Sequence, residues 1–248
     1  MEDYIFKIDQ VRKIYNYKGE INQIIFNNIY IPREMITFIK GETGIGKTTL
    51  LNILGLMDKI SFMENDNIIF LPDPNQTIDF RNIYSKRFKK YRIIENIRKN
   101  YFGFMFQHDH LIDAWKGWEN IILPDYIRNS HVSISKYKNK IHNLIELCNF
   151  SDMHELLERS PSTYSGGQRQ RTALLRALIH SPKVIFADEP FASISKKKAM
   201  EILNVFKNQA QKNGTTIIIV SHDIHDDILQ NININEINLN LSKHLKNK

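Results

Sequence analysis

The sequence predicts an α/β domain built around a parallel sheet, with an antiparallel β region near the N-terminus and a helical subdomain. Three short, mainly apolar segments, at 35–39, 184–187 and 216–220, have the length and composition of buried strands. Segments with apolar residues at helical spacing alternate with them, which is typical of a parallel sheet covered on both faces. We expect a single domain over 1–248, with a core at about 1–106 and 165–248 and the helical subdomain at about 107–164.

The N-terminal third is expected to begin with strands. Residues 5–31 mix short apolar alternations with turn residues such as Gly19, which indicates antiparallel pairing. After the strand at 35–39 and a glycine-rich loop, apolar residues recur at helical spacing at Leu50, Ile53, Leu54 and Met57. Residues 58–100 are mostly polar with little pattern, and their basic stretch at 85–92 is expected to lie on a helix.

Helices are expected to dominate the remainder. Residues 118–160 are expected to be mostly helical, ending at Ser160-Pro161. A helix through Leu174, Ala177 and Leu178 should stop near Ser181-Pro182, before the strand at 184–187. Another, through Ile202, Val205 and Phe206, should run to Asn213-Gly214, before the strand at 216–220. Ligands bind at the carboxyl ends of parallel strands, and reactive residues follow all three strands: Gly41 onward, Asp188-Glu189 and Ser221-His222.

Composition narrows the class of protein. A length of 248 residues with 42% hydrophobic residues suffices for one substantial domain with a buried core. No apolar run approaches the roughly 20 residues that a membrane-spanning helix needs, and the N-terminus lacks a signal-peptide pattern, so we expect a soluble, cytosolic chain. The net charge of +7 permits attraction to nucleic acid or anionic lipid without deciding between them. The only cysteine, Cys148, lies on an apolar helical stripe and is expected to be buried.

The loop after the first parallel strand reads GETGIGKTT and matches a phosphate-binding loop at every fixed position. Its glycines leave room for backbone N–H groups to wrap phosphates, and the positive end of the following helix points at the same charge. We expect Lys47 to bridge the outer phosphates and the Thr48 hydroxyl to bind Mg²⁺. The pattern predicts a P-loop NTPase core whose nucleotide contacts are Gly41, Glu42, Thr43, Gly44, Ile45, Gly46, Lys47, Thr48 and Thr49.

Two carboxylates follow the strand at 184–187. We expect Asp188 to hold Mg²⁺ through water and Glu189 to orient or deprotonate the attacking water, a role worth about 10²- to 10⁴-fold in rate. The competing interpretation is that both residues cap the next helix. The phosphate loop favours the catalytic one.

Histidines occur at several positions. His222 follows an apolar strand, where a neutral imidazole could hydrogen-bond the γ-phosphate, although an isolated histidine is more often an ordinary surface residue. His225, Asp226 and Asp227 suit the first turn of a helix. Residues 108–110, His-Asp-His, are interpreted as exposed loop residues, and no zinc is expected.

A second glycine motif, at 164–170, reads YSGGQRQ. Ser165 suits a helix N-cap, and glycines at a helix start permit close backbone approach to an anion. The motif follows the phosphate loop by more than a hundred residues, and the alternative is a plain glycine-rich loop between helices. The pattern therefore indicates a helix start at which Ser165, Gly166, Gly167 and Gln168 can approach an anion.

Together these motifs resemble those of ATP-binding cassette (ABC) ATPases over almost the whole chain. The resemblance implies ATP and Mg²⁺ as ligands, and a second copy whose 165–168 motif covers the first copy's ATP. It implies that Gln107 reaches the metal and attacking water, and that Tyr15 stacks on adenine, a contact worth about 1–3 kcal/mol. Tyr17 is the competing choice for the aromatic.

The chain departs from the family pattern at three places. Tyr164 stands where a leucine usually precedes the serine, a mild change because either side chain can pack under the loop. Ser195 ends a loop that normally ends in aspartate, so communication between the two nucleotide sites is expected to differ. Residues 231–241 alternate polar and apolar side chains without the usual aspartate-glycine hairpin.

Within the family, the segments 50–58 and 102–112 are most similar to the branch that drives lipoprotein release and macrolide efflux. This implies that the partner is a membrane permease and that the chain lies peripherally at the cytoplasmic face of the membrane. It also implies that the permease docks on the helical lobe that includes Trp115 and Trp118, although both could equally be ordinary packing residues. A mechanical regulator of cell-wall remodelling, or an ATPase acting on ribosomes or nucleic acid, is the alternative. The basic run SKRFKKYR admits contact with headgroups or nucleic acid, but a solvated helix face is favoured.

Overall fold

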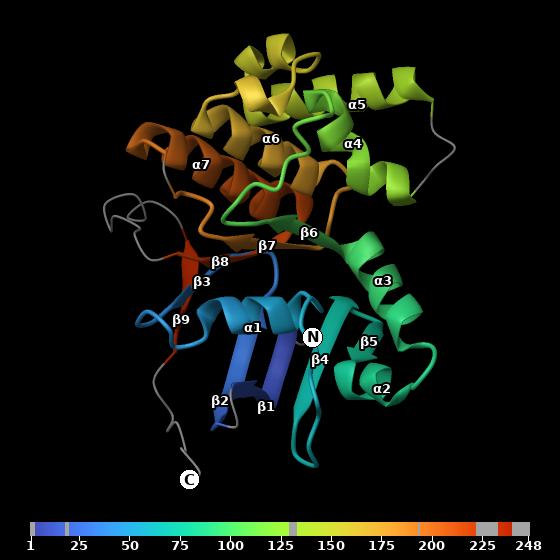
Figure 1. The fold of residues 1–248 in the computed structure, drawn as a ribbon, viewed down its shortest axis with the longest axis vertical. Coiled ribbons are helices and arrows are strands. Elements are labelled where there is room, and N and C mark those ends of the chain that lie inside the picture. The colour runs from blue at the N-terminus through green and yellow to red at the C-terminus, as the bar shows by residue number, and fades with distance from the viewer. Residues whose placement is uncertain (1–2, 18–19, 129–132, 193, 222–232, 240–248) are drawn as a thin grey trace.

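The computed structural model describes residues 3–17, 20–128, 133–192, 194–221 and 233–239, and it contains two sheets (Figure 1). The antiparallel sheet has the order β2-β1-β4-β5 and consists of β1 (Tyr4–Tyr17), β2 (Glu20–Pro32), β4 (Asn67–Asp73) and β5 (Gln76–Asp79). The parallel sheet has the order β6-β7-β8-β3-β9 and consists of β3 (Ile36–Lys40), β6 (Phe102–Met105), β7 (Val184–Asp188), β8 (Thr216–Val220) and β9 (Ile234–Asn238).

Seven α-helices are present in the described residues. They are α1 (Lys47–Leu54), α2 (Phe80–Ser85), α3 (Lys90–Tyr101), α4 (Gly117–Arg128), α5 (Ile134–Cys148), α6 (Gly166–Leu178) and α7 (Lys196–Asn213). Short 3₁₀ helices, η1 (Ser151–Leu156) and η2 (Pro161–Thr163), precede α6. No helix in the described ranges is long and apolar enough to span a bilayer.

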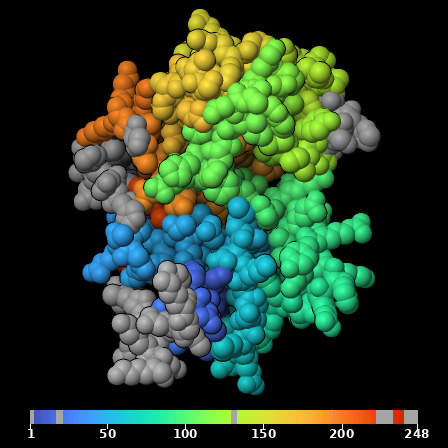
Figure 2. Space-filling view, in the orientation of Figure 1, coloured from blue at the N-terminus to red at the C-terminus, as the bar shows by residue number. Residues whose placement is uncertain are grey.

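The parallel sheet is buried on both faces because successive residues of a strand point in opposite directions. In β7, Ile185 and Ala187 join the apolar cluster that includes α4–α7, whereas Val184 and Phe186 join the cluster that includes α1 and the antiparallel sheet. Figure 1 shows the same layers, with α6 and α7 over one face and α1 over the other. Figure 2 shows the helices of the 117–180 region gathered at one end of the molecule and the N-terminal strands near the other.

Most predicted elements of the core are confirmed. The antiparallel pairing of residues 5–31 is present as β1 and β2, whose register places Val11 opposite Phe26. The helix expected to end at Asn213-Gly214 is α7, and Gly214 caps it in the left-handed conformation at φ 64°. Cys148 is 4% exposed, and burial raises the pKa of its thiol to about 12.

Two predictions about local structure were wrong, and two strands were not anticipated. Met57 lies beyond α1, because the helix ends at Leu54, Gly55 caps it, and Leu56 takes a positive φ of 55°. No strand was predicted from the sequence for 58–100, where β4 and β5 extend the antiparallel sheet. Residues 86–89 lie between α2 and α3, so only part of the basic stretch is helical.

Tyr164 packs as expected and gains polar contacts that a leucine could not make. Its side chain is buried, and its hydroxyl donates to the carbonyl oxygens of Leu156 and, at 3.1 Å, Arg159. Gly117 lies against this hydroxyl, where a Cβ atom would clash with it. The departure from the family pattern therefore anchors the turn before α6 to the chain at the end of η1 and leaves room only for a glycine at the start of α4.

Candidate nucleotide site

The phosphate loop connects β3 to α1 and depends on glycines with positive φ. The φ angles are 149° at Gly41, 82° at Gly44 and 107° at Gly46, a region that other residues rarely adopt. At Gly46 a Cβ atom would also lie 3.0 Å from Ile24 Cδ1. The glycines that the sequence singled out therefore hold a compact turn at the start of a helix, where backbone N–H groups remain available to an anion.

Lys47 is held over this loop. Its side chain is buried, and its ammonium donates to the carbonyl oxygens of Gly41 at 2.7 Å and Glu42 at 2.9 Å. Burial lowers the pKa of Lys47, and the charge of Glu189 opposes part of that shift. The lysine and the predicted catalytic carboxylate therefore belong to one electrostatic site.

Thr48 and Asp188 meet between α1 and the end of β7. The Thr48 hydroxyl donates to Asp188 Oδ1 at 3.2 Å, although the two residues are 140 positions apart. One hydroxyl and one carboxylate oxygen are hard donors of the kind that Mg²⁺ prefers. The donor set is therefore chemically suited to Mg²⁺.

Glu189 occupies a strained backbone conformation at the end of β7. Its φ is 48°, in the left-handed region that costs a non-glycine residue about 1–2 kcal/mol. The conformation is held by a 2.8 Å hydrogen bond from its N–H to the Val220 carbonyl and by the Ser221 hydroxyl, which donates to Glu189 Oε2 at 3.1 Å. Strain of this kind is concentrated at functional sites, which agrees with a catalytic role for this carboxylate.

Tyr15 lies beside the phosphate loop. Its hydroxyl is 2.8 Å from Thr49 Oγ1, and 38% of the residue is exposed. An accessible aromatic ring at this position can offer a face to a base. The side chain of Tyr17, the competing choice, lies outside the described residues, as does His222.

The glycine motif at 165–168 starts α6 as predicted. The Ser165 hydroxyl accepts from the Gln168 N–H at 3.4 Å, and Gln168 Oε1 accepts from the Ser165 N–H at 2.8 Å, which completes a capping box. Gly166 is exposed, whereas Gly167 is buried where a Cβ atom would lie 2.6 Å from Lys198 Nζ. Only the first glycine of the pair therefore presents open backbone, and the second permits packing against α7.

Gln107 is exposed and lines an open hollow of about 460 Å³ together with Gly166 and Ala192. Among the described residues it makes no hydrogen bond with Thr48 or Asp188. The structure therefore places Gln107 beside the 165–168 motif of its own chain and does not join it to the Thr48–Asp188 pair.

An ion-pair network behind Gln107 was not anticipated from the sequence. Both Asp109 oxygens accept hydrogen bonds from Arg169, each at 2.8 Å, and Arg169 also reaches Asp113 Oδ1 at 2.9 Å. Arg176 donates to the carbonyl oxygens of His110, at 2.9 Å, and Asp109. The interpretation of residues 108–110 as exposed loop residues was therefore wrong for Asp109, which is half-buried because α6 holds it.

Asp109 titrates abnormally for a physical reason. Burial alone would raise the pKa of its carboxyl, but hydrogen bonds from Arg169 and the Leu111 N–H outweigh it and lower the pKa. A carboxyl with a lowered pKa stabilises the fold above its unfolded-state pKa, and that contribution is lost as the pH falls through the folded-state pKa.

The fold and this site define a P-loop ATP-binding protein, with a phosphate loop before α1 and a serine-capped glycine pair at the start of α6. The sequence profile of the family described as ABC transporter matches residues 27–192. The chain belongs to the ABC transporter family and is an ABC ATPase, as the resemblance of its motifs implied.

Curated relatives and solved structures agree with this assignment. The chain is 31% identical to the lipoprotein-releasing system ATP-binding protein LolD of Rickettsia typhi over 90% of both chains, and 30% identical to that of Ehrlichia ruminantium strain Gardel over 88% of both. The dimeric structure of MJ0796, a bacterial ABC transporter cassette, shares the fold with a TM-score of 0.76, 24% identity and coverage of 94% of both chains. CbiO1 of Clostridium perfringens gives a TM-score of 0.68 and 26% identity, covering 90% of this chain and 80% of that one.

The Asp109–Arg169 pair can be tested by its effect on stability. Asp109→Asn is expected to lower the free energy of unfolding by about 1–3 kcal/mol at neutral pH, because it leaves the Arg169 guanidinium poorly paired. The difference from the wild type should shrink as the pH falls below about 4, the ordinary pKa range of aspartate. Urea unfolding across this pH range measures both effects. Asp73→Asn, which alters a pair with Lys183 in which both side chains are about half exposed, is the control, and a deficit for Asp109→Asn that does not change with pH would contradict the assignment.

Proposed function

We propose that this protein is the ATP-hydrolysing subunit of a membrane transporter and works as a pair of cassettes closed around two ATP molecules. The observation that carries the proposal is the position of two half-sites on opposite faces of one sheet. The phosphate loop leads into α1 on one face, and the 165–168 motif starts α6 on the other (Figure 1). The exposed Gly166 of one copy is then available to the nucleotide held by the phosphate loop of the other.

The residues of one phosphate loop suit the hydrolysis step. Lys47 would bind the outer phosphates, Thr49 and residues 41–46 would contact the nucleotide, and Tyr15 would stack on the adenine. Glu189 would orient the attacking water and accept its proton, since its carboxylate is fixed by Ser221 at a strand end. His222, which follows Ser221 in the chain, and Gln107 would contact the γ-phosphate side once two cassettes have closed.

Thr48 and Asp188 would hold Mg²⁺, with Gln107 as a further oxygen donor after closure. When bound, the metal would neutralise charge on the β- and γ-phosphates. The lowered pKa of Lys47 and the strained backbone of Glu189 support a site whose groups are positioned before substrate arrives.

A permease is the partner that the surface supports. A groove of about 530 Å³ lies between α3, β6, α4 and α6. Apolar side chains dominate its lining, among them Phe104, Phe106, Leu123, Pro124 and Ile127, while Arg98, Arg176 and His180 supply polar groups. Such a groove suits a short amphipathic helix, and we infer that a helical segment of the permease occupies it. The chain would then lie at the cytoplasmic face of the membrane, with about 107–164 as its helical subdomain.

The class of substrate that the transporter moves is inferred from the curated relatives. The two curated relatives named above are ATP-binding proteins of lipoprotein-releasing systems. This supports an exporter or lipoprotein-release function for the present chain, with two identical cassettes in the transporter.

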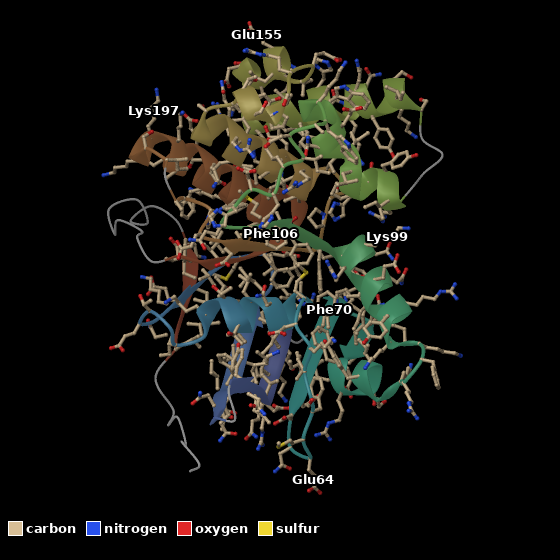
Figure 3. All side chains as sticks on the ribbon, in the orientation of Figure 1. Glu64, Phe70, Lys99, Phe106, Glu155 and Lys197 are labelled. Atoms are coloured by element: carbon tan, nitrogen blue, oxygen red, sulfur yellow. The ribbon has the colours of Figure 1, made fainter. Side chains whose placement is uncertain are left out.

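Replacement of Glu189 tests the catalytic assignment. Glu189→Gln should reduce ATP turnover by about 10²- to 10⁴-fold because the amide cannot accept a proton, and it should leave an ATP-bound dimer that accumulates. Phosphate release and light scattering with ATP measure the two effects. Glu64→Gln, an equivalent change at the lower tip of the molecule (Figure 3), should alter neither, and equal turnover in all three proteins would overturn the assignment.

Metal removal tests the Thr48–Asp188 pair. Chelation should abolish turnover, and added Mg²⁺ should restore it. Asp188→Asn should raise the Mg²⁺ concentration needed for half-maximal turnover by about tenfold or more, because it removes a charged oxygen donor. Asp152→Asn serves as the control, and an unchanged Mg²⁺ requirement for Asp188→Asn would contradict the metal role.

The groove makes a separate prediction about the partner. Ile127→Asp places a charge at the groove, whereas Ile134→Asp places the same charge on α5 outside it; the two isoleucines are 55% and 60% exposed. After solubilisation of native membranes, an integral membrane subunit should copurify with the wild type and with Ile134→Asp and be lost from Ile127→Asp. Recovery of ribosomes or DNA in place of a membrane subunit would favour the non-transport alternative.

A further inference from the structure

The segment between α2 and α3 presents an exposed aromatic side chain among positive charges. Phe88 is 89% exposed, the highest value among the exposed large hydrophobic residues described, and Tyr91 is 60% exposed. We define the basic tip as Lys86, Arg87, Phe88, Lys89, Lys90, Tyr91 and Arg92. Its five basic residues are exposed except for Lys90, which is half-buried. Figure 2 shows the α2–α3 region protruding at the side of the molecule.

The charges of the basic tip have no acidic partner within the described part of the chain. No ion pair there involves any of the five basic residues, and the sequence has no acidic residue between Asp79 and Glu95. Two cations lie near the exposed rings instead: Arg87 Cζ is 5.8 Å from the centre of Phe88, and Lys90 Nζ is 5.1 Å from that of Tyr91. The cations remain accessible to an external anion.

Stability of the helix does not account for this arrangement. Positive charges at the start of a helix oppose its dipole, and α3 begins with Lys90 and Tyr91 and has no acidic residue in its first turn. An exposed phenylalanine likewise contributes no burial to the fold. Both features disfavour the interpretation of the basic tip as a merely solvated face.

The positive charge continues along the outer side of α3. Lys89, Arg92 and Lys99 recur at helical spacing, and an open hollow of about 510 Å³ is lined by Arg92, Ile93, Glu95, Asn96 and Lys99. The other side of α3 packs on the core through Ile97, which is 4% exposed. The helix thus turns a mainly basic side outward.

We propose that the basic tip binds anionic phospholipid headgroups at the membrane surface, with the Phe88 ring entering the headgroup boundary. Lysine and arginine supply attraction to an anionic leaflet, and an exposed aromatic ring adds a short-range apolar contact. Tyr91 belongs to the basic tip and also lines the groove assigned to the permease, so the two surfaces adjoin. The inference therefore rests on the proposed function, which brings this side of the chain to a membrane. A surface next to a membrane is more readily met by anionic lipid than by nucleic acid, so we favour lipid as the ligand of the basic tip.

Cosedimentation of the full-length protein with vesicles tests the proposal. Wild type should bind phosphatidylcholine vesicles that contain phosphatidylglycerol, bind them more weakly at high salt, and bind pure phosphatidylcholine vesicles least. Arg87→Ser with Lys89→Ser should lower the partition coefficient by about fivefold for each charge, or about 25-fold together. Phe88→Ser should lower it by about tenfold, with a smaller dependence on salt.

A matched control separates the basic tip from net charge. Lys197→Ser with Lys212→Ser removes the same charge from exposed positions on α7; Figure 3 shows Lys197 and the α3 residue Lys99 on opposite sides of the molecule. This variant should bind anionic vesicles within about twofold of wild type. Equal binding by wild type and both double variants, or equal binding to neutral and anionic vesicles, would overturn the proposal.

Two further measurements distinguish a failure of the lipid proposal from a failure of the proposed function. If the basic-tip variants lose affinity for a DNA or RNA oligonucleotide but keep their affinity for vesicles, the surface is a nucleic-acid site and the lipid proposal is wrong. ATP turnover is measured on the same preparations. Normal turnover without vesicle binding rejects only the lipid contact, whereas an absence of turnover in the wild type counts against the proposed function itself.

Discussion

Burial of the parallel sheet on both faces is the constraint on which the rest of the structure depends. Because side chains alternate along each strand, every strand needs apolar cover above and below, and α1 and α6 supply it on opposite faces. The loops before these two helices are then separated by the sheet. In the proposed function the phosphate loop and the 165–168 motif serve different nucleotides, and two copies of the chain therefore pair.

The loop that follows β6 is held to α6 by charged hydrogen bonds. Arg169 and Arg176 extend from α6 and bind the carboxylate of Asp109 and the backbone carbonyls beside it. A guanidinium that forms paired hydrogen bonds fixes orientation as well as distance. The loop is therefore part of the same rigid unit as the start of α6, although some 60 residues separate them in the chain.

Local pattern was sufficient to predict the features that depend on neighbours in sequence. The phosphate loop, the capped start of α6 and the three central strands were predicted because glycine spacing, capping residues and apolar runs are local signals. Asp109 was wrongly predicted to be an exposed loop residue because its partner Arg169 is distant in sequence, and no local sequence pattern indicates such an ion pair. The strand β5 was missed because it is a short, partly exposed edge strand without an apolar run. The strand β4 was overlooked although its apolar run at Ile68–Leu71 is largely buried, because polar residues flank that run on both sides. Whether Gln107 contacts the Thr48–Asp188 pair could not be predicted from the sequence, since it depends on the position of the loop after β6 relative to α1 and β7.

The loop at 106–110 lines both the hollow beside Gly166 and the groove assigned to the permease. Gln107 faces the hollow beside Gly166, while Phe106 lines the groove assigned to the permease, and His110 lines both. Phe106 and His110 are in edge-to-face contact at 5.3 Å, and Arg176 binds the His110 carbonyl from α6. A displacement of this loop by a helix entering the groove would thus alter the surroundings of Gly166, and closure around nucleotide would alter the groove. Such reciprocity is required of any coupling between two binding sites, and here it has a contiguous chain of contacts to act through.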